Sequence, residues 1–228
     1  MLELLARGHV TVRGRMPGSS NAIFLVELAG DGATALAVYK PARGERPLWD
    51  FPAGLFRREV AAYLLSEALA WNLVPPTIER DGPYGAGSFQ LFVDADFSQH
   101  YFTLRDDSTH RDRLRRICLF DLVTNNADRK AGHCLLGPDG RIYAIDNALT
   151  FHAEPKLRTV IWDFGGDPID ATMLADVRRL VRAGVPSPLA ALIDKSEQAA
   201  LLARSRQLVG VRRFPRDDGG YRYPWPLI

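Results

Sequence analysis

A short, tightly closed β-hairpin is the most constraining local pattern in this sequence. Two apolar arms, residues 133–136 and 142–145, flank a Gly-Pro-Asp-Gly turn at 137–140. These turn residues favour a reversal of the chain, and the apolar arms favour strands. A hairpin brings the residues before its first arm next to those after its second. Asp128 and Asp146 are therefore expected to converge, although they are separated in sequence.

The first part of the chain has the pattern of a small mixed α/β unit. Apolar runs at 22–28 and 34–39, with an Ala-Gly-Asp-Gly turn at 29–32, predict a second hairpin. Apolar residues at helical spacing predict a helix over 55–71, which a pair of prolines ends. A further strand is expected at 88–93.

The second part of the chain is expected to be mainly helical. This change of predicted secondary structure near residue 93 divides the sequence into parts 1–93 and 94–228. Together they predict an α+β fold with an N-terminal antiparallel sheet and helix and a helical C-terminal part. Helices are predicted at 111–124, 170–183 and 188–208, and an extended, pinned tail at 212–228.

Length and composition limit the kinds of protein that this chain can be. At 228 residues and 46% hydrophobic content, the chain can bury one sizeable core or two small lobes around a cleft. A net charge of +2 gives no reason to expect a nucleic-acid partner. No apolar stretch approaches the ~18 residues that a membrane span needs, so no stable membrane insertion is expected. Cys118 and Cys134 lie in apolar surroundings, typical of core residues in a reducing cytoplasm. The oligomeric state is left open.

Polar residues are densest at 126–133, between a predicted helix and the hairpin. Phosphoryl transfer needs a carboxylate to orient the attacking hydroxyl, and oxygen or nitrogen ligands for a divalent ion. Asp128, His133 and Asp146 supply these types. The alternative is that Asp128 only ends a helix and His133 only begins a strand. Asp146, however, lies in an apolar run, where an unpaired charge is expensive, so a metal ion or a cation is a natural partner.

A second group of candidate residues lies near the N-terminus. A loop of small and polar residues at 18–21 precedes the first apolar strand, and Lys40 ends the next strand. Backbone N–H groups of such a loop can approach phosphate oxygens, and a lysine adds a point charge. Glu59, early on the following helix, could pair with Lys40. An ordinary turn, a solvated lysine and a solvated glutamate are the structural alternatives. The residues of the loop are Gly18, Ser19, Ser20 and Asn21.

The tripeptide at 163–165, Asp-Phe-Gly, has the letters of the metal-binding triplet of protein kinases. In the kinase arrangement that aspartate directly follows the short hairpin, and here Asp146 occupies that position. We therefore expect 163–166 to be a turn before a helix.

From Gly18 to Phe151 the chain resembles the phosphoinositide 3/4-kinases, most closely the type II phosphatidylinositol 4-kinases. Six segments in collinear order make the likeness specific. The resemblance implies a two-lobed, protein-kinase-like fold that uses ATP with Mg²⁺ or Mn²⁺. The six segments are 18–20, 37–41, 59–64, 87–93, 126–129 and 144–147.

The resemblance also implies individual roles. The catalytic residues would be Lys40, which contacts the phosphates, Asp128, which is the catalytic aspartate, and Arg129, which follows it in the catalytic loop. Asp146 would be the principal metal ligand. The family has asparagine where this chain has His133, which shifts the expected preference toward Mn²⁺. The residues implied at the adenine, on the strand leading to the hinge and in the hinge itself, are Gln90, Phe92 and Val93.

These observations predict an ATP-dependent kinase that transfers the γ-phosphate to a hydroxyl of a soluble acceptor, either a small polyol such as an inositol derivative or a protein. A phosphatidylinositol lipid kinase is the nearest competing function, although the chain lacks the cysteine-rich segment through which type II lipid kinases are acylated. The same residues are also compatible with a nucleotide-binding pseudokinase and with an enzyme that transfers AMP.

Overall fold

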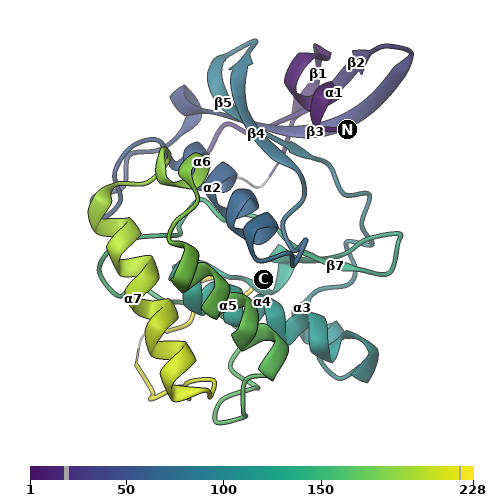
Figure 1. The fold of residues 1–228 in the computed structure, drawn as a ribbon. Coiled ribbons are helices and arrows are strands. Elements are labelled where there is room, and N and C mark those ends of the chain that lie inside the picture. The colour runs from purple at the N-terminus through teal and green to yellow at the C-terminus, as the bar shows by residue number, and fades with distance from the viewer. Residues whose placement is uncertain (18–20, 221) are drawn as a thin grey trace.

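The computed structural model describes residues 1–17, 21–220 and 222–228. After a short helix α1 (Leu2–Arg7), the N-terminal part forms a five-stranded antiparallel sheet in the order β1-β2-β3-β5-β4, at one end of the molecule (Figure 1). Its strands are β1 (His9–Arg15), β2 (Phe24–Gly30), β3 (Ala33–Pro41), β4 (Thr77–Gly82) and β5 (Gly85–Leu91).

The hairpin expected between 22–28 and 34–39 is confirmed as β2 and β3. Gly30 pairs with Ala33, which leaves a two-residue turn at Asp31 and Gly32, both with positive φ. Such a turn matches the right-handed twist of the two strands. The apolar residues of β2, β3 and β5 form a small core on one face of the sheet with Leu5 of α1.

A 14-residue helix, α2 (Leu55–Ala68), lies between the sheet and the C-terminal helices (Figure 1). Ten of its residues are buried, so it has no wide polar face. Ala61, Leu65 and their neighbours belong to the larger hydrophobic core, which is otherwise built from residues beyond α2. The division of the chain at residue 93 stays a prediction, and α2 contributes to packing on both sides of it.

The C-terminal part is mainly helical, as expected. Helix α4 (Arg111–Thr124) has the bounds that the sequence indicated, and the hairpin of β6 (Cys134–Leu136) and β7 (Ile142–Ala144) follows it. Short 3₁₀ segments lie at η1 (Ala42–Gly44), η2 (Ser108–His110) and η3 (Ala131–His133). The other elements are α3 (Tyr101–Leu104), α5 (Ala171–Ala183), α6 (Ser187–Ala190) and α7 (Lys195–Val211).

The single helix expected over 188–208 is wrong, because the chain forms α6 and α7 with a break between them. Asp194 caps α7: its Oδ1 accepts from the Glu197 N–H at 2.8 Å, and Glu197 Oε2 accepts from the Asp194 N–H at 3.0 Å. This reciprocal pair satisfies backbone donors that a continuous helix would bond internally.

The tail beyond α7 is pinned to the body, as predicted. Phe214 is buried and its N–H donates to the Asp167 carbonyl at 3.0 Å. Near the end of the chain, the Leu227 carbonyl accepts from the Ala131 N–H at 2.8 Å. In the described ranges 1–17, 21–220 and 222–228, no helix has the length and apolar character to span a membrane.

Candidate active site

Lys40, Glu59 and Asp146 come together at the junction of the sheet, α2 and the β6–β7 hairpin. Lys40 Nζ, near the end of β3, donates to Glu59 Oε1 on α2 and to Asp146 Oδ1, the latter at 2.9 Å. Glu59 is 1% exposed and the side chain of Asp146 is 42% exposed. The pairing of Lys40 with Glu59 that the sequence suggested is therefore present, and Asp146 adds a second carboxylate to it.

The charges at this junction keep Asp146 ionised. Lys40 holds the pKa of the Asp146 carboxyl well below its usual range, against the effect of burial. Burial by itself would lower the pKa of Lys40, but the carboxylates of Asp146 and Glu59 raise it. Asp146 also has a left-handed backbone, with φ of 55°. Such strain at a non-glycine residue is typical of functional sites.

Asp128 lies in the loop between α4 and η3. Burial raises the pKa of its carboxyl to about 6; the charge of Lys130, with Nζ 3.6 Å from Asp128 Oδ2, acts against this, and the charge of Asp146 adds to it. The loop and the hairpin thus bring Asp128 and Asp146 within electrostatic reach, as the turn at 137–140 predicted. The Asp128 N–H donates to Asn126 Oδ1 at 2.9 Å, which fixes the backbone beside the carboxylate.

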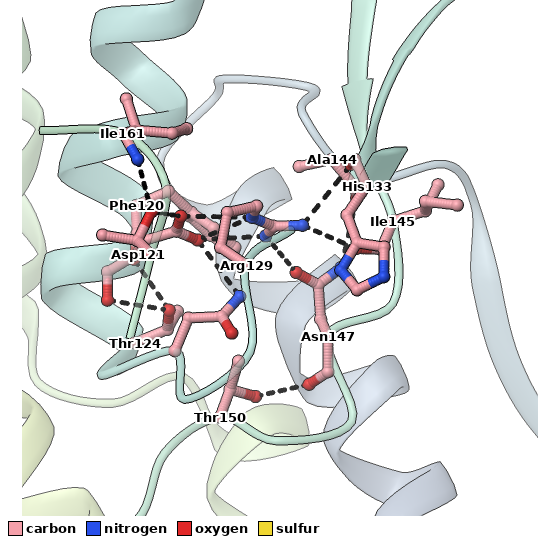
Figure 2. A network of polar contacts seen from close by, with 12 residues as sticks. Phe120, Asp121, Thr124, Arg129, His133, Ala144, Ile145, Asn147, Thr150 and Ile161 are labelled. Carbon is pink, nitrogen blue, oxygen red and sulfur yellow. Dashed lines mark hydrogen bonds and ion pairs between the residues drawn. The ribbon is translucent and has the colours of Figure 1, made fainter. Parts of the chain in front are cut away.

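Arg129 is fully buried at the centre of a polar network (Figure 2). Its Nε donates to both oxygens of Asp121 at 3.1 Å. Its Nη1 donates to the Ile145 carbonyl at 2.6 Å, and its Nη2 to Asn147 Oδ1 at 2.7 Å. The expectation that Arg129 is a catalytic residue needs correction, because its guanidinium has no exposed surface with which to touch a substrate. It joins α4 and the Asp128 loop to the segment that carries Asp146.

Asp121 and Asn147 are the partners of Arg129 that sequence reasoning did not assign to the site. Both are buried. A signal for Asp121 was present, since an aspartate falls among the apolar residues of the helix 111–124. Asn147 also connects the site to α2, because its N–H donates to Glu59 Oε2.

His133 follows the loop in η3 and points at Asp146. Its Nε2 lies 3.3 Å from Asp146 Oδ2, and its Nδ1 accepts from the Lys130 N–H at 3.3 Å. Burial lowers the pKa of His133 to about 4, so the ring is neutral near pH 7. The two contacts together fit the tautomer with the hydrogen on Nε2. In this arrangement His133 Nε2 faces the Asp146 carboxylate, and its role as a metal ligand stays a prediction.

The residues expected at the nucleotide divide into two groups. Gly18, Ser19 and Ser20 lie outside the described residues. Asn21 is described, and its Oδ1 accepts from the Arg46 N–H at 3.0 Å.

The residues expected at the adenine lie near the end of β5 and directly after it. Gln90 is buried, and its Nε2 donates to Thr77 Oγ1 at 2.9 Å. The Phe92 N–H donates to the Leu36 carbonyl at 3.0 Å. In the described part of the chain, the Val93 N–H has no hydrogen-bond partner, and its contact with a nucleotide stays a prediction.

The donor set fits a divalent ion that takes most of its ligands from phosphate and water. Mg²⁺ is held in this way by one or two carboxylates. Asp146 is ionised and partly exposed, which suits it to this task. Among the residues that the structure describes, no cluster of three His, Cys, Asp or Glu side chains could hold an ion by itself.

The Asp-Phe-Gly tripeptide at 163–165 is a turn, as predicted, and has structural contacts. Asp163 Oδ2 accepts a hydrogen bond from the Tyr101 hydroxyl. Phe164 is buried and its ring lies 5.8 Å from that of Phe214 in the tail.

Comparisons with known proteins agree with this architecture. No family model matches the chain. The chain is 43% identical over 262 aligned residues to Protein Rv2133c of Mycobacterium tuberculosis (strain ATCC 25618 / H37Rv), and the alignment covers 99% of this chain and 94% of the relative.

Two solved structures are similar in fold at low sequence identity. The structure of hydra Fam20 with sugar has a TM-score of 0.57 and 13% identity, covering 92% of this chain and 87% of that one. The Helicobacter pylori proinflammatory kinase CtkA has a TM-score of 0.52 and 8% identity, covering 92% and 94%. The predicted α+β, kinase-like fold is thereby confirmed. The chain belongs to the same family as Protein Rv2133c and has a kinase-like fold.

Proposed function

We propose that this protein is an ATP-dependent, metal-requiring phosphotransferase that moves the γ-phosphate of ATP to a hydroxyl of a soluble acceptor. The observation that carries the proposal is the joint contact of Lys40 with Glu59 and Asp146. A lysine held by a helix glutamate, next to an ionised aspartate, is the arrangement with which kinases bind phosphates and metal. The fold and the six collinear sequence segments support the same conclusion.

Lys40 is the residue that contacts the phosphates in this proposal, and Glu59 holds it in place. Asp146, with His133 beside it, holds the divalent ion, Mg²⁺ or Mn²⁺. When bound, the ion would neutralise negative charge that develops on the phosphates. The Val93 N–H is the donor for the adenine.

Asp128 accepts the proton of the acceptor hydroxyl as its oxygen attacks the γ-phosphorus and the bond to the β-phosphate oxygen breaks, releasing ADP. A pKa of about 6 suits this task, because the group is ionised near neutral pH and still takes up a proton. Arg129 is a positioning residue, since its bonds to Asp121 and Asn147 fix the two segments that carry Asp128 and Asp146.

The test is ATP turnover by the purified protein with Mg²⁺ or Mn²⁺ and a panel of inositols, sugars and proteins. Lys40→Ala, Asp128→Asn and Asp146→Asn are each expected to lower turnover at least a hundredfold. Asp163→Asn, in the Asp-Phe-Gly turn, is the matched control and is expected to retain wild-type turnover. Wild-type activity in Asp146→Asn would overturn the proposal.

The same experiment separates the competing functions. Phosphatidylinositol vesicles test the lipid kinase that the sequence resemblance suggests. The intact mass of the modified acceptor distinguishes a gain of phosphate from a gain of AMP. Nucleotide binding without turnover with either metal would identify a pseudokinase.

A further inference from the structure

A basic cavity of about 420 Å³ lies beside the Asp128 loop. Three cationic side chains and one carboxylate line it. Its volume is in the range of sites that hold small molecules. The lining residues are Asp50, Pro155, Lys156, Leu157, Arg158 and Arg222.

The backbone attaches this cavity directly to the catalytic loop. The Arg158 N–H donates to the Asn126 carbonyl at 2.9 Å, and the Arg129 N–H donates to the Arg158 carbonyl at 3.0 Å. The tail closes the other side, since the Thr159 N–H donates to the Arg222 carbonyl at 2.9 Å. Residues on either side of Asp128 are therefore hydrogen-bonded to the segment that supplies Arg158.

The cationic charge in the cavity is only partly neutralised. Lys156 Nζ pairs with Asp50 at 3.2 Å, and both side chains are largely buried. Arg222 pairs with Asp218 at 2.6 Å, but that aspartate is 61% exposed. In the described part of the chain, the Arg158 guanidinium makes no hydrogen bond and no ion pair.

Arg158 is also close enough to act on the catalytic carboxylate. Burial raises the pKa of Asp128, and the positive charge of Arg158, with that of Lys130, acts in the opposite direction. A group bound by Arg158 would thus lie near the proposed attacking hydroxyl.

We infer that the acceptor is a small hydroxyl compound that carries a phosphate or carboxylate group, and that Arg158 and Arg222 bind this group in the cavity beside Asp128. The inference rests on the proposed phosphotransferase function. An arginine guanidinium recognises these planar or tetrahedral oxyanions through paired N–H donors. The Arg158 guanidinium, which has no hydrogen bond or ion pair in the described part of the chain, can bind such a group without giving up a protein partner.

A second cavity adjoins the first. It measures about 450 Å³ and shares Asp50 and Lys156 with the first. Trp49, which is 95% exposed, lines it, and Lys156 Nζ lies 5.7 Å from the centre of that ring. The exposed ring gives the remainder of the acceptor a flat apolar surface to contact.

The inference is tested by binding to the full chain loaded with Mg²⁺ and a non-hydrolysable ATP analogue, so that the nucleotide site is filled. The probes are matched pairs: glycerol 3-phosphate with glycerol, glucose 6-phosphate with glucose, and gluconate with sorbitol. Ligand-detected NMR at 150 mM salt, on the order of physiological ionic strength, measures each dissociation constant. At least one anionic probe is expected to bind at least tenfold more tightly than its neutral partner.

Variants test whether Arg158 and Arg222 cause the preference for anionic probes. Arg158→Gln and Arg222→Gln are each expected to weaken binding of the anionic probe at least fivefold, with little effect on the neutral one. Arg158→Lys retains part of the preference because it keeps the charge. Arg182→Gln, at an exposed position near the end of α5, is the control and is expected to bind as wild type. Melting temperatures of all variants exclude loss of folding as the cause.

The double variant Arg158→Gln/Arg222→Gln and phosphatidylserine vesicles are tested alongside. Three outcomes would overturn the inference: equal binding of charged and neutral probes, an anion preference that survives in the double variant, or binding of the vesicles without binding of any small anionic probe. The last would assign the cavity to a membrane headgroup. ATP turnover is measured in parallel. Turnover without anion preference rejects the acceptor inference alone, whereas no turnover with either metal rejects the proposed function.

Discussion

Glu59 on α2 accepts a hydrogen bond from the backbone N–H of Asn147 at 2.9 Å, across 88 positions of sequence. The other oxygen of the same carboxylate accepts from Lys40. One buried side chain therefore sets the position of the lysine and of the segment that carries Asp146. This relationship ties the sheet, α2 and the β6–β7 hairpin into a single site.

Glu59→Gln tests this bridge. The amide places an N–H group where one of two donors now binds, so one contact is lost and a buried donor is left unpaired. We expect kcat/KM for ATP to fall by about 30- to 100-fold, which corresponds to about 2–3 kcal/mol. Glu67→Gln, on an exposed position of the same helix, is the control. Unchanged kinetics in Glu59→Gln would show that Lys40 and Asp146 are positioned by other contacts.

The pH profile of kcat/KM should report Asp128. Since its pKa is raised to about 6 by burial and the ionised form accepts the proton, activity is expected to rise through pH 6 and level off above pH 7. Steady-state rates between pH 5 and 8 measure this. A flat profile over that range would contradict the assignment of Asp128 as the base.

The ionised carboxylate of Asp128 should also destabilise the folded chain at neutral pH. Its pKa is higher in the folded chain than the ordinary value of 3.8, so its stabilising contribution is complete below about pH 4 and is lost as the pH rises through 6. Asp128→Asn, which cannot ionise, is expected to stabilise the fold at pH 7 by about 1 kcal/mol, discounted for partial exposure. This raises the melting temperature by about 2–4 °C. At pH 4 the difference should vanish, and a lower melting temperature at both pH values would contradict the linkage.

Arg129→Ala is expected to destabilise the fold by about 3–5 kcal/mol, because it leaves Asp121 as a buried charge without its partner. The melting temperature should fall by roughly 10 °C. Arg7→Ala breaks an exposed pair with Glu3 and should change it little. Thermal unfolding of the wild type, Arg129→Ala and Arg7→Ala measures these differences. Equal melting temperatures would mean that the Arg129 network does not stabilise the fold.

His133→Asn addresses the choice of metal. Asparagine offers an oxygen, which Mg²⁺ accepts more readily than an imidazole nitrogen. If His133 is a ligand, the ratio of Mg²⁺-supported to Mn²⁺-supported turnover is expected to rise about tenfold on this change. An unchanged ratio with lower activity would show that His133 supports Asp146 without binding the ion.

The sequence indicated the elements with strong local signals. Helix α4 and the two hairpins were predicted closely, because their periodicity and turn residues act over a few positions. Strands β1 and β4 were not predicted. They are the two edges of the sheet and are rich in polar and charged residues, as in Thr-Ile-Glu-Arg-Asp-Gly of β4, so they lack the apolar runs that marked β2 and β3. The break between α6 and α7 was missed for a different reason, since the capping pair Asp194 and Glu197 also fits a helix interior.

The sequence by itself determined that Asp128 and Asp146 converge, because a hairpin with a tight turn allows few arrangements of its two ends. It also suggested Lys40 and Glu59 as a pair. Only the tertiary structure decided that Arg129 is buried against Asp121 rather than exposed to a substrate, and that His133 Nε2 faces the Asp146 carboxylate. It alone brought Arg158 and Arg222 beside the Asp128 loop. Burial and contacts between distant segments depend on how all elements pack, which local patterns of sequence do not specify.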